Sequence, residues 1–440
     1  MLTVSSNGRY IQRNGTPFLG HGYVAWSLIT ELQQSDMIYF LDDMQSKGIT
    51  SLIVEAIEYD TAPLSNFYGD LPFTGSLGGG NLDFTTPNSA WWNLVDFFID
   101  ACADRFIVPW ILPAYYGFIP SLEGWGVAGQ LAANGTTRLN TYGQFLGNRY
   151  ASYDIVWVHF GDGLPDATGR GLVKAIADGI RATAPGHLHS NHYARPSLST
   201  DNIEVVPDIN WAYSRGAGFA PYVHKVVLDG YAYTPTQPVY LGEDYYQNRN
   251  ASPIVTAQQQ RQNSWDTWFS GGKARFLGDE FVWSFNRPTT MNPAPVQNWY
   301  DHLNDIGTLQ YAPVRQFLIE REWWLLDAST GTGLVTAGGG TVDTAAYKPR
   351  GLASDGSYGC VYVSDGTSVT VNTSLVNGGV NRKRWYDPTN GTYQAATGQG
   401  GGVFVASSEV GNNAGGGTDW VLAIDAINPV QVPAFGFWVS

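Results

Sequence analysis

PVYLGEDYYQ, residues 238–247, runs from an apolar, strand-like stretch directly into two adjacent carboxylates, Glu243 and Asp244. Desolvating an unpaired charge is costly, so a strand that ends in this way needs a compensating role, and catalysis is one. A second run, DIVWVHFGD (154–162), also ends in a glycine followed by a carboxylate, Asp162. From Phe18 onward such apolar runs alternate with amphipathic segments of helical length, which indicates repeated βα units over a parallel sheet.

Eight strand-like runs can be counted, which predicts a (β/α)8 TIM barrel in an α/β protein. We place the barrel in residues 1–322, with a small N-terminal hairpin bracketed by the turns Asn7-Gly8 and Asn14-Gly15. In this architecture functional residues lie at the C-terminal ends of the strands. The runs are FLGHGYVAW (18–26), SLIVEAI (51–57), RFIVPWILPAYY (105–116), DIVWVHFGD (154–162), HLHSNHYA (187–194), DINWAYS (208–214), PVYLGED (238–244) and ARFLGDEFVWSF (274–285).

The C-terminal part of the chain has a different composition. Residues 323–440 are rich in Gly, Thr, Ser and Val, and short alternating runs such as GCVYVSD, SVTVNTS and DWVLAID are separated by turn residues. This pattern predicts a smaller all-β sandwich as an accessory domain. Its few aromatic residues favour a supporting role over glycan binding. Cys102 and Cys360 lie in segments of different character, so we expect two separate buried thiols.

Composition and charge limit the partners. The 440 residues carry 24 Lys and Arg against 38 Asp and Glu, a net charge of -14, with no basic run, so nucleic acid is excluded as a partner. An acidic surface favours a neutral or weakly charged ligand unless a local cationic pocket overrides the field. No apolar window reaches membrane-spanning length and the N-terminus lacks a leader-like apolar region. We expect an extracellular protein if a leader was removed.

The carboxylates at the ends of the fourth and seventh runs, Asp162 and Glu243, suit cleavage of a glycosidic bond. One carboxylic acid protonates the leaving oxygen, and the second carboxylate attacks the anomeric carbon at about 5–5.5 Å or activates water at about 6.5–9.5 Å. Either residue alone could simply cap a loop. Two at equivalent strand ends of one barrel, flanked by aromatic residues, favour chemistry.

Further acidic residues occupy other strand ends. Glu55 and Glu58 follow the second run, and Asp279 and Glu280 lie within the eighth. Alternation does not decide which of Asp279 and Glu280 points inward, and the outward one would pair with a helix. We interpret all four as substrate-binding groups or as charges that raise the pKa of the general acid.

Aromatic residues gather at the same ends. Their faces suit the apolar faces of sugar rings, while Tyr and Trp keep a polar group for hydroxyls. We assign roughly half of them to the core, with Trp157 as an example. The cluster comprises Trp26, Trp110, Tyr115, Tyr116, Trp125, Trp211, Tyr213, Tyr245, Tyr246 and Trp283.

The run HLHSNH raises the question of a metal site. His187 and His189 would point the same way on a strand, as in some barrel metallohydrolases, but only His21 and His159 could supply ligands from other strands. We therefore expect no metal and no cofactor. His192 and Asn191 are interpreted as contacts to sugar hydroxyls, since both can donate and accept. The predicted substrate-binding residues are His21, Tyr23, Trp26, Glu55, Glu58, Trp110, Tyr115, His159, Asn191, His192, Trp211, Tyr213, Tyr245, Asp279, Glu280 and Trp283.

Several short motifs together resemble the apiosidase-like glycoside hydrolases. The blocks NGRYIQRNGTPFLGHGYVAW, YFLDDMQSKG, NFYGDLPF, YGQFLGNRY, IVWVHFGD and PVYLGEDYYQ occur in the family's order, and RKRWYDPTNGTYQ with DWVLAID resembles the collagen-binding type of β-sandwich that often follows such a barrel. The resemblance implies a retaining glycosidase with Asp162 as acid/base and Glu243 as nucleophile.

The chain also departs from the family pattern. The family's G-D-T-A-W at the first strand end reads Gly22-Tyr23-Val24-Ala25-Trp26, and its His-rich eighth strand end reads Gly278-Asp279-Glu280. The catalytic carboxylates persist while the sugar-reading residues differ, so the pattern does not predict apiose specificity. Our leading hypothesis is a retaining glycoside hydrolase acting on a polysaccharide or oligosaccharide. The alternatives are a non-catalytic glycan-binding or particle-surface protein and a metal-dependent hydrolase that uses the histidine cluster.

Overall fold

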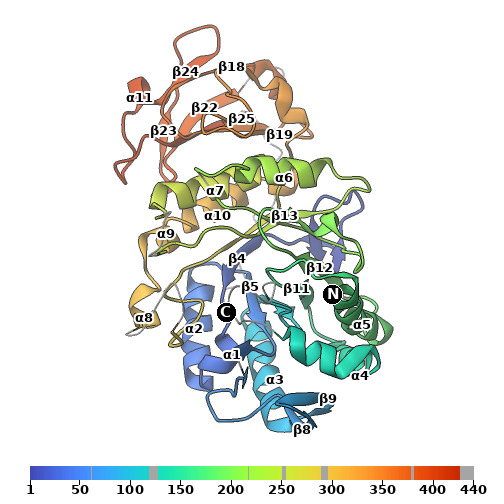
Figure 1. Ribbon diagram of the computed structural model, residues 1–440. Coiled ribbons are helices and arrows are strands. Elements are labelled where there is room, and N and C mark those ends of the chain that lie inside the picture. The colour runs from blue at the N-terminus through green and yellow to red at the C-terminus, as the bar shows by residue number, and fades with distance from the viewer. Residues whose placement is uncertain are drawn as a thin grey trace. The chain divides into compact units, whose positions relative to one another are not determined.

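The computed structural model describes residues 1–60, 62–117, 127–216, 218–249, 254–288, 296–377 and 381–426 (Figure 1). The chain forms two compact units. The first comprises Met1–Arg215, Ala232–Val255 and Lys273–Asp305, and the second comprises Gly216–Tyr231, Thr256–Gly272 and Ile306–Ser440.

The first unit contains a nearly closed parallel barrel, which confirms the predicted fold class. Each of the eight predicted runs holds one strand, and neighbouring strands pair in the order β12-β11-β10-β5-β4-β16-β15-β14. A short strand, β13 (Ser197–Leu198), pairs antiparallel with β14. The barrel strands are β4 (Gly20–Val24), β5 (Ser51–Glu55), β10 (Val108–Leu112), β11 (Val156–Phe160), β12 (Leu188–His192), β14 (Asn210–Tyr213), β15 (Val239–Glu243) and β16 (Ala274–Leu277).

Large aromatic side chains fill the barrel. Trp110 stacks on Tyr240 with ring centres 5.3 Å apart and contacts Trp211 and Phe276. Glycine at position 22 of the first strand leaves room for these rings, since a side chain there would place its Cβ 2.4 Å from the Phe276 ring. Glycine therefore occupies the inward positions at the start of β4, and the intervening side chains point outward.

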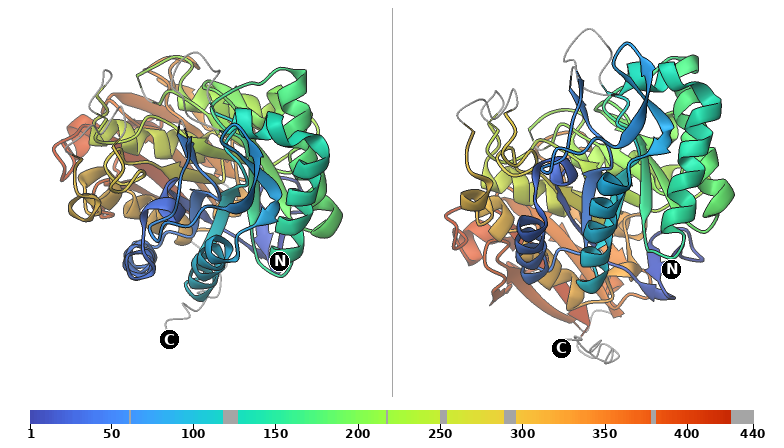
Figure 2. Two further views of the ribbon diagram at one scale, coloured as in Figure 1. Left: turned by 60° about the horizontal axis from the view of Figure 1, so that its bottom comes forward. Right: turned by 90° about the horizontal axis from the view of Figure 1, so that it is seen from below.

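Helices and short hairpins surround these strands (Figure 2). Gln130 and Asn134 of α4 accept hydrogen bonds from Leu82 and Phe84 of β9, at 2.8 and 2.9 Å, which fixes that hairpin to the helix. The helices of this unit are α1 (Leu28–Glu31), α2 (Gln34–Ser46), α3 (Ser89–Asp104), α4 (Ala128–Tyr150), α5 (Ala167–Thr183) and α8 (Trp299–His302), and the outer strands are β1 (Leu2–Val4), β2 (Ile11–Arg13), β3 (Thr16–Pro17), β6 (Tyr59–Asp60), β7 (Ala62–Pro63), β8 (Phe73–Gly78) and β9 (Asn81–Pro87).

The predicted N-terminal hairpin is present. β1 and β2 pair antiparallel, and Leu2 and Ile11 are buried in the same hydrophobic cluster as the barrel interior. Its apolar residues therefore extend the barrel core. Both cysteines are free and buried, as expected.

The second unit contains the C-terminal all-β domain together with helices from earlier parts of the chain. A six-stranded sheet and a three-stranded sheet enclose a core that includes Val361, Val369, Trp385, Phe404 and Leu422. The larger sheet has the order β17 (Leu326–Asp327), β19 (Arg350–Ala353), β20 (Tyr358–Val363), β25 (Trp420–Ala426), β22 (Asn381–Tyr386) and β23 (Tyr393–Ala395); the smaller has β18 (Val335–Ala337), β21 (Ser368–Val371) and β24 (Val403–Val405), followed by α11 (Ala406–Glu409).

Two helices that follow barrel strands along the chain cluster with this domain. They are α6 (Val223–Ala232) and α7 (Ala257–Phe269), beside α9 (Ile306–Leu309) and α10 (Ala312–Ile319). On α7, Arg261 makes two hydrogen bonds to the buried Asp419, at 2.7 and 2.9 Å. The domain boundary expected between residues 322 and 323 stays a prediction.

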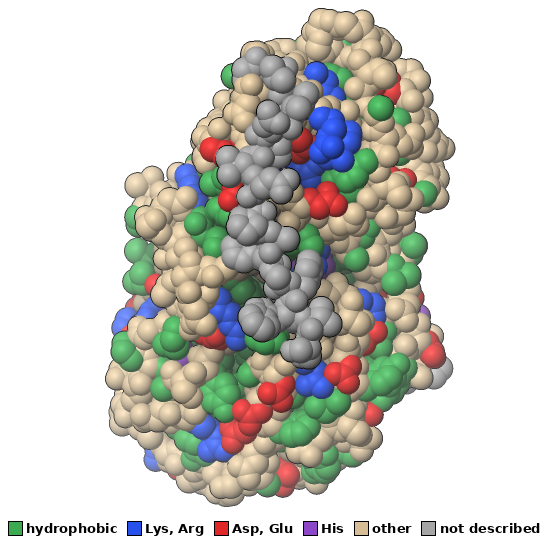
Figure 3. All heavy atoms as spheres, turned by 180° about the vertical axis from the view of Figure 1, so that it is seen from behind, with side chains coloured by type: hydrophobic (Ala, Val, Ile, Leu, Met, Phe, Trp, Pro, Cys, Tyr) green, Lys and Arg blue, Asp and Glu red, His purple; other side chains and the backbone are tan. Residues whose placement is uncertain are grey.

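Charged side chains of both signs are interspersed on the face that Figure 3 shows, without a continuous basic patch among the described residues. None of the described helices combines the length and apolar character needed to cross a lipid bilayer.

Candidate active site

Two glycines bring the carboxylates Asp162 and Glu243 to the carboxyl end of the barrel. Gly161 has φ 112°, and a Cβ there would lie 2.6 Å from the Tyr115 ring. A Cβ at Gly242 would lie 1.9 Å from Trp211. A larger residue at either position would collide with the aromatic ring beside it and displace the backbone.

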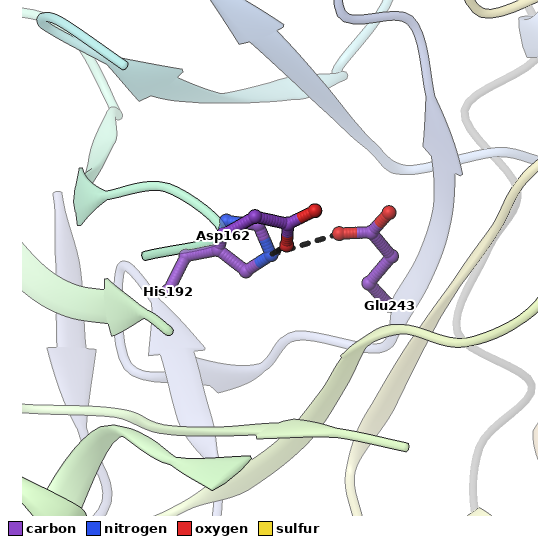
Figure 4. Close-up of side chains that lie close together, drawn as sticks. All are labelled: Asp162, His192 and Glu243. Atoms are coloured by element: carbon purple, nitrogen blue, oxygen red, sulfur yellow. Dashed lines mark ion pairs between the residues drawn. The ribbon is translucent and has the colours of Figure 1, made fainter. Parts of the chain in front are cut away.

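The two carboxylates converge on one histidine. His192, the last residue of β12, places Nε2 2.8 Å from Glu243 Oε2 and 3.3 Å from Asp162 Oδ1. One ligand-capable atom from each of the three residues lies within 4.8 Å of the others. Figure 4 shows the three side chains pointing toward one another. They are largely buried, with side-chain exposures of 1% for His192, 13% for Asp162 and 10% for Glu243.

Aromatic residues hold this cluster in place. Tyr246 donates to Glu243 Oε1 at 2.6 Å and accepts from Trp26 Nε1 at 2.7 Å. The His192 ring stacks with those of Trp26 and Tyr213, at 5.8 and 5.1 Å between centres. The nucleophile candidate and the histidine beside it are thus both oriented by contacts outside the pair.

Electrostatics separate the two carboxylates. Burial, together with the nearby Glu243, raises the pKa of Asp162 to about 7, against the opposing effect of His192 and Arg195. Burial alone would lower the pKa of His192, but Glu243 and Asp162 raise it above its usual value. Asp162 therefore keeps its proton close to neutrality, as a general acid requires.

The other predicted carboxylates form a second group near the pair. Burial and Glu58 raise the pKa of Glu55 well above its usual value, with smaller contributions from Asp162 and Glu243. Glu58 itself pairs with Arg287 at 2.6 Å and accepts from Ser27 at 2.8 Å.

Two carboxylates, Asp279 and Glu280, follow the eighth strand, and Glu243 contributes to the raised pKa of Glu280. Its pKa is raised to about 7, mainly by burial and partly by Glu243, and Trp283 Nε1 donates to it at 3.0 Å. Asp279 accepts from the Phe281 backbone and from Asn248 at 2.8–3.1 Å, and burial raises its pKa to about 8.

Four predicted sugar contacts do not reach the mouth, and their assignment is withdrawn. Tyr23 contacts Phe40 of α2, His159 lies 2.8 Å from His189, and Asn191 donates to the Val205 carbonyl at 2.7 Å. These side chains and His21 alternate with inward-facing neighbours, so they point away from the barrel axis.

Two predicted aromatic contacts lie deeper than expected. Trp110 packs among the core rings of the barrel, and Trp211 lies beneath His192, 5.1 Å from its ring. Asp279 lies beside Asn248, and Trp125 falls outside the described residues. The other predicted contacts lie around or close to the carboxylate pair; they are Trp26, Tyr115, Tyr213, Tyr245, Glu55, Glu58, Glu280 and Trp283.

The histidine run does not form the metal site that was considered. His187 Nδ1 accepts from Trp157 at 2.9 Å, and His189 faces His159. Within the described ranges, Asp162, His192 and Glu243 are the one group of His, Cys, Asp or Glu side chains with the spacing of metal ligands.

Sequence reasoning missed several residues of this region. Tyr246 was noted only as one aromatic among many, although it hydrogen-bonds Glu243. Arg195, Arg249 and Arg287 were not singled out. Each follows a barrel strand on its carboxyl side, so charged residues shortly after strand ends were the available signal.

Comparison with solved structures shows the class of fold. A family 5 glycoside hydrolase from Bacteroides vulgatus aligns over 99% of this chain and 95% of its own, with 20% identity and a TM-score of 0.80. A structure titled "Glycoside hydrolase" aligns over 98% of both chains, with 20% identity and a TM-score of 0.79. A family 5 mannosidase from Rhizomucor miehei aligns over 72% of this chain and 97% of its own, with 11% identity and a TM-score of 0.50.

Family models identify the chain more closely. Residues 5–325 match the model "Apiosidase-like, catalytic domain", and residues 343–425 match "Putative collagen-binding domain of a collagenase". The chain belongs to the apiosidase-like family and is a glycoside hydrolase, as the sequence motifs implied. No curated protein sequence matches it.

Proposed function

We propose that the protein is a retaining glycoside hydrolase in which Glu243 is the nucleophile and Asp162 the acid/base. The spacing of the pair carries this proposal. Oxygen atoms of the two carboxylates lie within 4.8 Å of each other. Retaining enzymes hold their carboxyl groups about 5–5.5 Å apart, whereas inverting enzymes leave about 6.5–9.5 Å for a water molecule.

The reaction runs in two displacements. Ionised Glu243 attacks the anomeric carbon while protonated Asp162 transfers its proton to the leaving oxygen, which breaks the glycosidic bond and forms a glycosyl ester on Glu243. Asp162, now ionised, takes a proton from water as the water attacks the same carbon and releases Glu243. Tyr246 donates to Glu243 Oε1 and His192 Nε2 lies 2.8 Å from Oε2, so both contacts orient the attacking carboxylate.

The substrate is a polysaccharide or oligosaccharide. Trp26 stacks on His192 and Trp283 donates to Glu280, and we expect these rings to offer the aromatic surface that sugar rings require. The first strand end carries Tyr23 where the resemblance would place an acidic contact, so the proposal does not include apiose.

A panel of polysaccharides and aryl glycosides, with NMR detection of the first-formed anomer, tests this function. We expect the product anomer to match the substrate anomer, and turnover to fall by orders of magnitude in Glu243→Gln and Asp162→Asn while both variants stay folded. Asp42→Asn, at a side chain that is 59% exposed, is the matched control. An inverted anomer, or near-normal turnover in a folded Glu243→Gln protein, contradicts the assignment.

A metal-dependent hydrolase is the second candidate, because Asp162, His192 and Glu243 have the spacing of metal ligands. A metal bound there would hold Asp162 ionised as a ligand, so that carboxyl could not act as the general acid. Dialysis against a chelator separates the two candidates. The retaining mechanism predicts unchanged turnover, and a loss that added metal restores would favour the metal enzyme.

A further inference from the structure

Two arginines lie near the acidic groups of the site without forming an ion pair among the described residues: Arg195 interacts electrostatically with Asp162 and Glu243, and both Arg195 and Arg249 interact with Glu280. Arg195 follows β12 by three residues and Arg249 follows β15 by six, so both lie at the carboxyl end of the barrel. Among the described side chains, neither guanidinium has a carboxylate oxygen within 4.0 Å. By contrast, Arg287 at the same end is paired with Glu58 at 2.6 Å.

The two arginines share one aromatic ring. Arg195 Cζ lies 4.8 Å and Arg249 Cζ lies 4.3 Å from the centre of the Tyr245 ring. Arg195 also donates to Tyr213 Oη at 3.1 Å, and the ring of Tyr213 stacks with that of His192. Contacts therefore connect the arginine pair to the histidine between the carboxylates.

Both guanidinium groups retain capacity for an anion. Their side chains are half-buried, and Arg249 Nε is buried without a hydrogen-bond partner among the described residues. A partly desolvated guanidinium with unused donors is costly in the absence of an anion. Guanidinium groups bind planar or tetrahedral oxyanions through paired hydrogen bonds, so a carboxylate or sulfate fits these donors.

We propose that Arg195, Arg249 and Tyr245 form a subsite for an anionic sugar, whose ring carries a carboxylate or a sulfate ester, adjacent to the bond that is cleaved. The inference deepens the proposed function and rests on it for the position of that bond. A local cationic pair of this kind overrides the repulsion that a chain with a net charge of -14 exerts on acidic glycans. Glu55 and Glu58 interact with Arg287, whereas Glu280 interacts electrostatically with Arg249 and Arg195 and partly offsets their charge.

Binding of matched glycan pairs tests the subsite. Each uronate-containing oligosaccharide is compared with its carboxyl-reduced counterpart, and each sulfated one with its desulfated counterpart, by calorimetry on the Glu243→Gln protein, which binds without turnover. We expect at least one acidic member to bind about 30-fold or more tightly than its neutral counterpart. The uronate and sulfate arms identify which anion is recognised.

Arginine variants locate the recognition. In the same background, Arg249→Gln and Arg195→Gln should reduce the preference to below about threefold, and Arg249→Lys should restore part of it. Arg382→Gln, which removes an exposed arginine of β22, should leave the preference unchanged. Thermal unfolding of each variant checks the fold, and Arg249→Lys keeps the test valid if Arg249→Gln is unstable.

The outcomes for the subsite and for the enzyme can be told apart. Equal binding of acidic and neutral members, no binding of any acidic member, or a preference that persists in both folded glutamine variants overturns the subsite. An arginine-dependent preference in a wild-type protein that hydrolyses none of the panel supports the subsite and contradicts the proposed function.

Discussion

Glu243 and Asp244 are neighbours in the chain, but they lie in opposite environments. Asp244 is 2% exposed and accepts two hydrogen bonds from the fully buried Arg275, at 2.9 and 3.1 Å. Glu243 lies on the other side of the strand, where His192 Nε2 is 2.8 Å from its Oε2 and Tyr246 donates to its Oε1. The outer carboxylate is paired with a guanidinium, whereas the inner one shares its histidine with a second carboxylate, Asp162.

The comparison shows where this barrel is built for stability and where for chemistry. A buried charge with a complete set of partners holds the structure together, and removing one partner is strongly destabilising. Two carboxylates gathered around one histidine repel each other, and the pKa of Asp162 is raised to about 7, which is unfavourable for folding and useful for catalysis. Substitution of Glu243 should therefore lower turnover and spare stability, whereas substitution of Asp244 should lower stability.

The largest expected effect is the loss of turnover in Glu243→Gln, on the order of 10⁴-fold, because the amide cannot form the glycosyl ester. The unfolding free energy of this variant should be unchanged or higher by about 1 kcal/mol, since a charge that repels Asp162 is removed. Urea denaturation together with hydrolysis rates measures both quantities. A folded variant that hydrolyses substrate at the wild-type rate would show that Glu243 is not the nucleophile.

The outer neighbour should respond in the opposite way. Asp244→Asn leaves the Arg275 guanidinium buried without a counter-charge, so we expect the free energy of unfolding to fall by about 3–5 kcal/mol. Asp42→Asn is again the control, because exposed ion pairs contribute little. If urea denaturation shows equal stability for Asp244→Asn and Asp42→Asn, the paired outer carboxylate is not a structural element.

The fold could be predicted from the sequence because a barrel of parallel strands needs eight apolar runs of strand length, separated by segments of helical length. It located Asp162 and Glu243 because the carboxyl ends of parallel strands share one edge. It failed where the phase of a strand mattered. Both faces of a parallel barrel strand are buried, so hydrophobicity does not show that Gly22 points inward and Tyr23 outward.

Loop residues were the other failure. Arg195, Arg249 and Arg287 lie outside the strands. Only the folded chain shows that Arg287 pairs with Glu58, while the other two form no ion pair with a described residue. Tyr246 is separated from Glu243 by three positions, and its role depends on a turn that composition does not reveal.

Removing the hydroxyl of Tyr246 should lower catalytic efficiency by less than the loss of Glu243. Tyr246→Phe deletes the 2.6 Å hydrogen bond to Glu243 and leaves Trp26 Nε1 without its acceptor. A hydrogen bond to a charged group is worth about 1.5–3 kcal/mol, so kcat/KM should fall about 10- to 100-fold. Stability should change less than in Asp244→Asn. A change in KM alone would place Tyr246 in substrate binding rather than in orienting the nucleophile.

The smallest expected effect is a shift in the pH profile. Hydrolysis needs protonated Asp162, so kcat/KM should decline as the pH rises through about 7. Glu243 raises the pKa of this carboxyl, while His192, Arg195 and the Tyr213 hydrogen bond lower it. His192→Gln removes a positive charge, and the alkaline decline should move to higher pH, whereas Arg382→Gln should leave it in place. If kcat/KM of His192→Gln declines at the same pH as that of the wild type, His192 does not set the pKa that controls the decline.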